Sequence, residues 1–223
     1  MKLETILLGR VIRPGRFIGR PGGLYLYDVN KALIERYGFA KAPVKLEEYD
    51  ESKGVTYQHG KFSAKTSEGV REIVIDMFQI FNNGVLADVR FDTSAADQFL
   101  DDVIAWSVTT WGAIFQDNEP VEKIYLSNLE ISFSKPLTAY VPSSSLLGGE
   151  ISKYLTQYGL KHEPYEVTGI ALHFDKTLMQ NSLLTNFTLA RREGSSFKTG
   201  LYFSSAPLKT ADHISLLENL EKA

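Results

Sequence analysis

The chain has 223 residues, enough for one sizeable domain or two small ones, and its 43% hydrophobic content is sufficient for a buried core. It has no cysteine, which excludes disulfides, thiolate nucleophiles and cysteine-ligated metal centres and favours a reducing compartment. Its uncharged runs are too short to span a bilayer, and its first residues lack the apolar core of a signal peptide. We therefore expect a cytoplasmic protein with no membrane partner.

The formal net charge of −3 conceals a basic N-terminal segment. A first strand is expected over residues 3–12, and proline and glycine then interrupt regular structure over residues 13–23. This pattern predicts an exposed loop that carries Arg13, Arg16 and Arg20, whose guanidinium groups suit phosphate, nucleic acid or an acidic protein partner. A merely solvated loop is the alternative interpretation.

A short helix follows this loop. Asp28 is its expected cap, Tyr37 its last residue, and Gly38 occupies the position that commonly terminates a helix. Short strands are expected on either side of this helix, over residues 24–29, 44–49 and 55–62.

The clearest hairpin signal is Asn82-Asn83-Gly84 between two β-prone runs. With Asn83 and Gly84 at the centre of a tight turn, alternation assigns one face of the hairpin to the core. The members of that face are Val74, Asp76, Phe78, Ile80, Ala87, Val89 and Phe91. The opposite face mixes polar side chains with the apolar residues Ile75, Met77, Phe81 and Leu86. This mixture is typical of an interface, which these four residues are predicted to form, unless the last helix covers them within one chain.

A helix is expected over residues 94–111, with Ser94 as its cap and Gly112 as its terminator. Its apolar stripe comprises Ala96, Phe99, Leu100, Val103, Ser107 and Trp111. Three acids lie mostly off this stripe, at Asp97, Asp101 and Asp102. We interpret them as a solvated face that compensates the helix dipole, in preference to a cation site.

The remaining elements are a strand over residues 121–133, a helix over 150–158, strands over 165–174, 183–192 and 198–204, and a helix over 210–222. Residues 136–149 are rich in proline, serine and glycine and are predicted to be a flexible segment. The order has too many consecutive strands for a doubly wound protein. It predicts an α+β fold, with mostly antiparallel sheet of about ten strands and about four helices packed on it.

We expect residues 1–223 to form a single domain, with a two-lobe division within 136–149 as the alternative. The chain also contains a faint internal echo. Tyr37-Gly38 and Tyr158-Gly159 each end an expected helix, and Pro43 and Pro164 follow at the same distance. Duplication explains the echo, but ordinary helix termination also does so and is the interpretation we prefer.

Candidate catalytic residues are few. Asp76 is a carboxylate on the predicted core face, where it needs a partner or a proton unless the strand ends or the register slips there. His173 and Asp175 alternate along an expected strand, so they share a face and would suit acid–base chemistry. An exposed strand face explains the same pattern, and no second histidine lies at a metal-ligand spacing. We predict no metal and no cofactor, and keep these three residues as candidates only.

Two hypotheses for function follow. The first is a non-enzymatic interaction, assembly or structural protein that works through a homo-oligomeric or partner interface. The alternative is a small hydrolase that acts on a phosphate-containing substrate through an Asp/His site and the arginine loop. Convergence of Asp76, His173 and the arginine loop in one pocket would favour the hydrolase.

Overall fold

We describe the protein from a computed structural model, which covers residues 1–18, 26–117, 123–162, 165–175, 177, 184–194 and 199–222, the first three of the second range by backbone alone. The strands are β1 (Lys2–Ile18), β2 (Val55–Thr66), β3 (Gly69–Phe81), β4 (Gly84–Val89), β5 (Ile114–Asp117), β6 (Ile124–Ser132), β7 (Gly169–Leu172), β8 (Phe187–Arg191) and β9 (Leu201–Ala206). The helices are α1 (Leu26–Tyr37), α2 (Thr93–Trp111), α3 (Pro142–Gln157) and α4 (Thr210–Lys222), with short 3₁₀ turns η1 (Leu46–Tyr49) and η2 (Leu137–Ala139).

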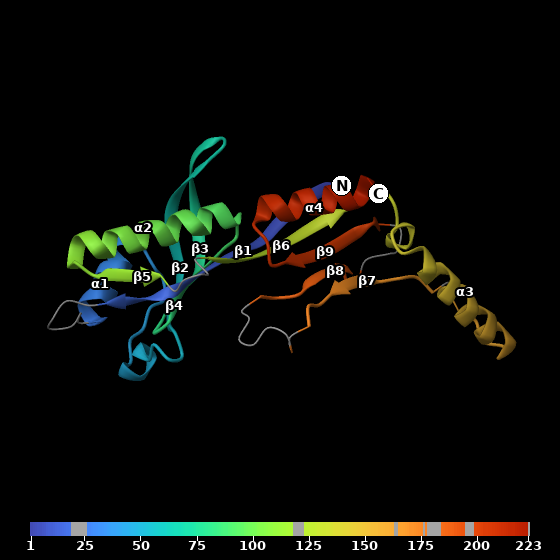
Figure 1. Cartoon of the computed structure of the whole chain (residues 1–223), viewed down its shortest axis with the longest axis horizontal. Helices are drawn as coiled ribbons and strands as arrows, with labels where there is room; N and C mark the ends of the chain where they lie inside the picture. Colours follow the sequence, from blue (N-terminus) through green and yellow to red (C-terminus); the bar gives the residue numbers. More distant parts are fainter. Residues whose placement is uncertain are drawn as a thin grey trace.

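The described strands form one antiparallel sheet in the order β2-β3-β4-β1-β6-β9-β8-β7, with β5 beside the end of β1. The predicted α+β class is therefore confirmed. α1, α2 and α4 pack on one face of this sheet, whereas α3 projects away from it (Figure 1). Within the described residues, no helix is both long and apolar enough to cross a membrane.

The described elements repeat one arrangement twice. The N-terminal half (residues 2–111) runs β1-α1-β2-β3-β4-α2, and the C-terminal half (residues 124–222) runs β6-α3-β7-β8-β9-α4. In each half the strands lie in the order second, third, fourth, first, and the two first strands, β1 and β6, pair at the centre of the sheet. The halves are thus related by an approximate two-fold axis. This relation favours duplication as the cause of the Tyr-Gly echo.

The strand register is also repeated. In each half, one row of paired residues runs from the first strand through the fourth to the third beneath the helices. The members are Val11, Ala87 and Phe78 in the N-terminal half and Leu129, Ser204 and Leu189 in the C-terminal half. Because every one of them is fully buried, the same row forms the floor of both cores.

Two threonines mark the approximate axis. Thr93 and Thr210 are the first residues of α2 and α4, each placed at the same distance after the end of its strand. The Thr93 N–H donates to the Thr210 hydroxyl at 3.0 Å, and the Thr210 N–H donates to the Thr93 hydroxyl at 2.9 Å. Figure 1 shows the two helices meeting end to end there. Each threonine therefore satisfies a backbone donor that helix geometry leaves without an intrahelical acceptor.

The N-terminal core closes around α2. The predicted stripe of α2 is buried at Ala96, Phe99, Leu100, Val103 and Ser107. Asp92, rather than Ser94, caps the helix by accepting from the Ala95 N–H, and Gly112 ends it in the left-handed conformation at φ 61°. Helix α1 lies against α2, with the Tyr37 ring 5.1 Å edge-on from that of Phe99.

The predicted arginine loop is partly wrong, because β1 continues to Ile18. Proline does not stop the strand here, since pairing with β4 ends at Pro14 and pairing with β5 begins at Gly15. A side chain at Gly15 would collide with the Gln116 carbonyl and the Phe115 ring, so only glycine permits the crossing.

The predicted hairpin register is wrong in two places. Phe81 pairs with Gly84, so the turn residues are Asn82 and Asn83. A β-bulge between Ile75 and Met77 then reverses the alternation, which no local sequence signal indicated.

The predicted flexible segment at residues 136–149 is also wrong, because it holds η2 and the first turns of α3. Pro142 is compatible with this earlier helix start, since proline is accepted in the first turn, where its missing N–H would have no intrahelical acceptor.

Candidate functional site

Of the three arginines predicted to form a basic contact surface, Arg13 is held in ion pairs. Arg13 binds Asp117 through Nε at 2.8 Å and Asp101 through Nη1 at 2.9 Å. The bond from Arg13 lowers the pKa of the Asp117 carboxyl. Arg10 binds Asp88 through two bonds of 2.6 and 2.7 Å. These pairs form because β1 lies beside β4, β5 and α2, which carry Asp88, Asp117 and Asp101. Arg13 is therefore not the exposed contact that the sequence predicted.

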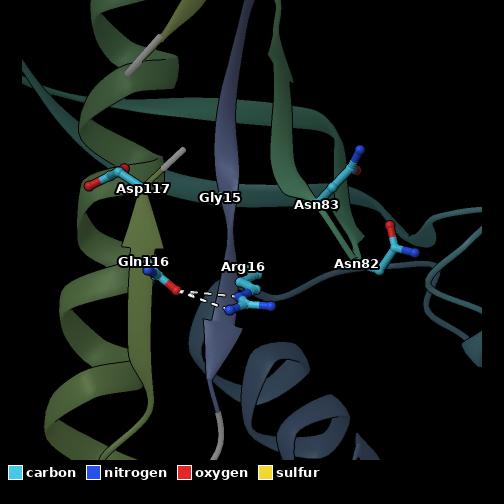
Figure 2. A pocket seen from close by; sticks show the side chains of 6 residues that line it. All are labelled: Gly15, Arg16, Asn82, Asn83, Gln116 and Asp117. Carbon is cyan, nitrogen blue, oxygen red and sulfur yellow. Dashed lines mark hydrogen bonds between the residues drawn. The ribbon is translucent and has the colours of Figure 1, made fainter. Parts of the chain in front are cut away.

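Arg16 remains exposed at a cleft of about 600 Å³ where β1, β5 and the β3–β4 turn meet. Figure 2 shows its guanidinium beside Gln116, to whose Oε1 it donates two weak bonds of 3.3 Å, while the Asp117 side chain points away. Asn82 and Asn83 form the other wall. Arg20, the third predicted contact, lies outside the described residues. The cleft is therefore polar and open, with a single arginine directed into it.

The acids of α2 are paired rather than merely solvated. Asp97 lies 2.6 Å from Lys123 Nζ, Asp101 binds Arg13, and Asp102 lies 3.0 Å from Arg36 Nη2. Since each carboxylate already faces a basic side chain, the arrangement does not favour a cation site. Within the described part of the chain, no cluster of metal-ligating side chains is found.

Asp76 lies at the β-bulge and accepts a 2.7 Å bond from Arg90 Nε. It lines a cleft of about 430 Å³ with His59, whose φ of 57° is unusual for a residue with a side chain. Arg71 stands over the Phe91 ring at the same cleft. The bulge and the arginine partner explain how this carboxylate is tolerated on a largely apolar strand.

His173 and Asp175 lie at the opposite edge of the sheet, beyond the end of β7 at Leu172. The alternation that was expected to put them on one face therefore does not apply, because they are outside the strand. His173 is exposed, and Asp175 accepts bonds from the backbone and hydroxyl of Thr177. The structure does not bring either residue together with Asp76 or with Arg16.

The predicted interface residues divide between the two faces of the sheet. Ile75 is wrongly assigned, since the bulge turns it into the N-terminal core, where it is fully buried. Met77, Phe81 and Leu86 do share the face opposite the helices. Phe81 packs against Gly54, and Leu86 is only 8% exposed. Their role in binding stays a prediction.

One buried polar cluster has no signal in the sequence. His213 of α4 is fully buried between two serines, with Nδ1 2.8 Å from Ser127 Oγ and Nε2 2.8 Å from Ser204 Oγ. Burial lowers the pKa of the imidazole to about 4, so the ring is neutral near neutral pH. Both ring nitrogens are occupied, and none of the described clefts reaches the ring, so the cluster is structural.

Helix α3 exposes several large apolar side chains. Leu147, Tyr154 and Tyr158 lie on one side of this helix at helical spacing, and all are exposed. The opposite side is covered by the chain returning toward β7, since a side chain at Gly148 would collide with the Tyr165 carbonyl.

Comparison of the chain with protein-family models and with curated proteins finds no match.

Proposed function

We propose that the protein is a non-enzymatic assembly protein whose working form is a homo-oligomer. The observation that carries this proposal is the exposed apolar side of α3. This helix projects from the sheet (Figure 1), and Leu147, Tyr154 and Tyr158 on that side are exposed. Large apolar side chains exposed side by side are typical of a protein–protein contact, and a like copy is the commonest partner.

The hydrolase hypothesis has less support. Its candidates Asp76, Arg16 and His173 occupy separate parts of the sheet, and no described pocket contains more than one of them. Each also has a structural explanation, namely an ion pair, an amide contact and an exposed loop position.

Light scattering of the purified chain over a micromolar concentration series tests the proposal. We expect a molar mass that rises toward a multiple of the 25.0 kDa chain. A constant mass of 25.0 kDa over the whole series would overturn it. The variant Met77→Asp serves as a comparison on the outer sheet face. Loss of assembly in this variant, with assembly unaffected in the α3 variant Tyr158→Asp, would keep the function but move the interface to the predicted hairpin face.

A further inference from the structure

The two halves allow α3 to be compared with its counterpart, α1, residue by residue. Both helices end in Tyr-Gly, at Tyr37-Gly38 and at Tyr158-Gly159. Both glycines are left-handed, with φ of 63° and 73°. Since the elements also occupy the same place in the repeat, these termini define which positions correspond.

The positions that α1 buries are the positions that α3 exposes. Leu33 and Tyr37 of α1 are 1% and 3% exposed, because they pack into the N-terminal core. Their counterparts on α3, Tyr154 and Tyr158, are 51% and 69% exposed. The apolar character of the contact is kept in the C-terminal half, but the contact itself is not made within the chain.

The surface that would receive such a helix is exposed as well. In the N-terminal half, Phe99 of α2 is fully buried against Tyr37 and Phe39. The residue at the same place in α4 is Leu216, which is 43% exposed. Leu160, the counterpart of Phe39, is 56% exposed. The apolar side of α3 and the surface of α4 that would receive it are therefore both exposed within one chain.

The polar residues beside the apolar contact differ between the two halves, on the first helix and on the second. In the N-terminal half, Asp102 of α2 accepts bonds from Arg36 and from the Tyr37 hydroxyl. The corresponding residues in the C-terminal half are Asn219 of α4 and Gln157 of α3. A charged pair is thus matched by two amides, which can hydrogen-bond to each other, so neither surface would bury an unpaired charge on docking.

The helix is held away from its own acceptor surface at both ends. Leu137 of η2 is buried in the C-terminal core, and its N–H donates to the Tyr202 hydroxyl at 3.1 Å. On the returning chain, Val167 packs against the same core, and the Arg191 N–H donates to the Thr168 carbonyl at 2.7 Å. Both ends of the α3 segment are therefore anchored in the C-terminal core, while the helix between them projects from the sheet (Figure 1).

We propose that two copies exchange this element, so that residues 141–162, the α3 arm, dock on α4 and the adjoining sheet of the partner as α1 docks on α2. The inference rests on the proposed homo-oligomer and names its interface. Each copy gives one arm and receives one, which closes a two-fold dimer and leaves neither surface vacant.

Cysteine cross-linking tests the exchange, because the chain has no cysteine of its own. Gln157→Cys protein is mixed with an equal amount of Asn219→Cys protein and treated with a short bismaleimide. We expect a cross-linked product of twice the 25.0 kDa chain, with the bond between positions 157 and 219. The matched control, Ser143→Cys at the base of α3, should give at least tenfold less of this product with Asn219→Cys.

The remaining outcomes are distinguishable. A wild-type chain that is monomeric by light scattering would overturn both the assembly function and the exchange. An oligomer without the 157–219 product would overturn the exchange alone. In the double variant Gln157→Cys/Asn219→Cys, an internal cross-link with no mixed product would show that the arm closes on its own chain, which also contradicts the proposal.

Discussion

The N-terminal and C-terminal halves share one topology and one register, yet only the N-terminal half covers its sheet with two helices. Its core contains many aromatic rings, and α1 packs against the side of α2. In the C-terminal half the corresponding helix projects into solvent, and the core is smaller. The difference shows that one topology can pack its first helix on the sheet in one half and leave it exposed in the other.

A second difference lies where the second helix of each half packs on the sheet. In the N-terminal half, three small residues allow α2 to lie close on the sheet, namely Gly9, Ala87 and Ala96. The corresponding positions in the C-terminal half hold Ser127, Ser204 and His213, which form the buried hydrogen-bonded cluster. Close packing and a satisfied polar cluster are thus alternative solutions at the same three positions.

The largest expected effect is on the aromatic core. Phe78→Ala removes a fully buried ring that contacts those of Tyr57 and Phe99, and should lower the free energy of unfolding by about 3–5 kcal/mol. Leu189→Ala, at the corresponding position, should cost about 2–3 kcal/mol because less surface is lost. Denaturant melts measure both. A larger loss at Leu189 than at Phe78 would break the comparison of the two cores.

The histidine cluster should make the stability of the protein depend on pH. Because the folded pKa of His213 is about 4 and the ordinary value is 6.5, the unfolded chain takes up the proton first as pH falls. The free energy of unfolding should therefore decrease from about pH 6.5 to about pH 4, by roughly 3 kcal/mol, and this contribution should then level off.

The variant Ser127→Gly/Ser204→Ala/His213→Ala introduces the residue types found at the corresponding positions of the N-terminal half, and it sharpens this test. Its free energy of unfolding should lack the His213 contribution in the same pH window when compared with wild type. Equal slopes for the two proteins would show that His213 is not buried as a neutral ring.

The reciprocal threonine hydrogen bonds at the axis between the halves should contribute less to the free energy of unfolding. Thr93→Val keeps the shape of the side chain but leaves the buried Thr210 N–H without its acceptor, which should cost about 1–3 kcal/mol. Thr109→Val on the exposed side of α2 is the matched control and should change stability by less than about 0.5 kcal/mol. Similar losses at the two sites would mean that the reciprocal bonds do not join the halves.

The smallest effect is expected at the helix contact itself. Arg36→Gln with Asp102→Asn converts the ion pair of the N-terminal half into the amides of the C-terminal half. Since both side chains are about a third or more exposed, the loss should stay below about 1 kcal/mol in denaturant melts. A loss above about 2 kcal/mol would show that amides cannot serve in this contact, against the docking proposed for α3.

Much of the fold could be predicted from local pattern. The fold class, the stripe of α2, and the glycines that end α1 and α2 follow from periodicity and helix-capping chemistry. The bulge at Asp76 and the crossing at Gly15 depend on contacts with other strands, so local alternation could not indicate them.

The candidate site was less accessible from the sequence. Arg13 looked free because its partners Asp101 and Asp117 are distant in the chain. His213 gave no signal because its serine partners come from two other strands. The Tyr-Gly echo was visible, but only the shared sheet order shows that it belongs to a repeat.

The central claim is that the C-terminal half is completed by a second copy, and the thermal midpoint as a function of protein concentration tests it most directly. A dimer stabilises the folded chain by mass action, so the wild-type midpoint should rise with concentration. Tyr158→Asp, which places a charge on the exposed tyrosine of α3, should abolish this dependence without changing the fold at low concentration. A wild-type midpoint that does not change with concentration would contradict the claim.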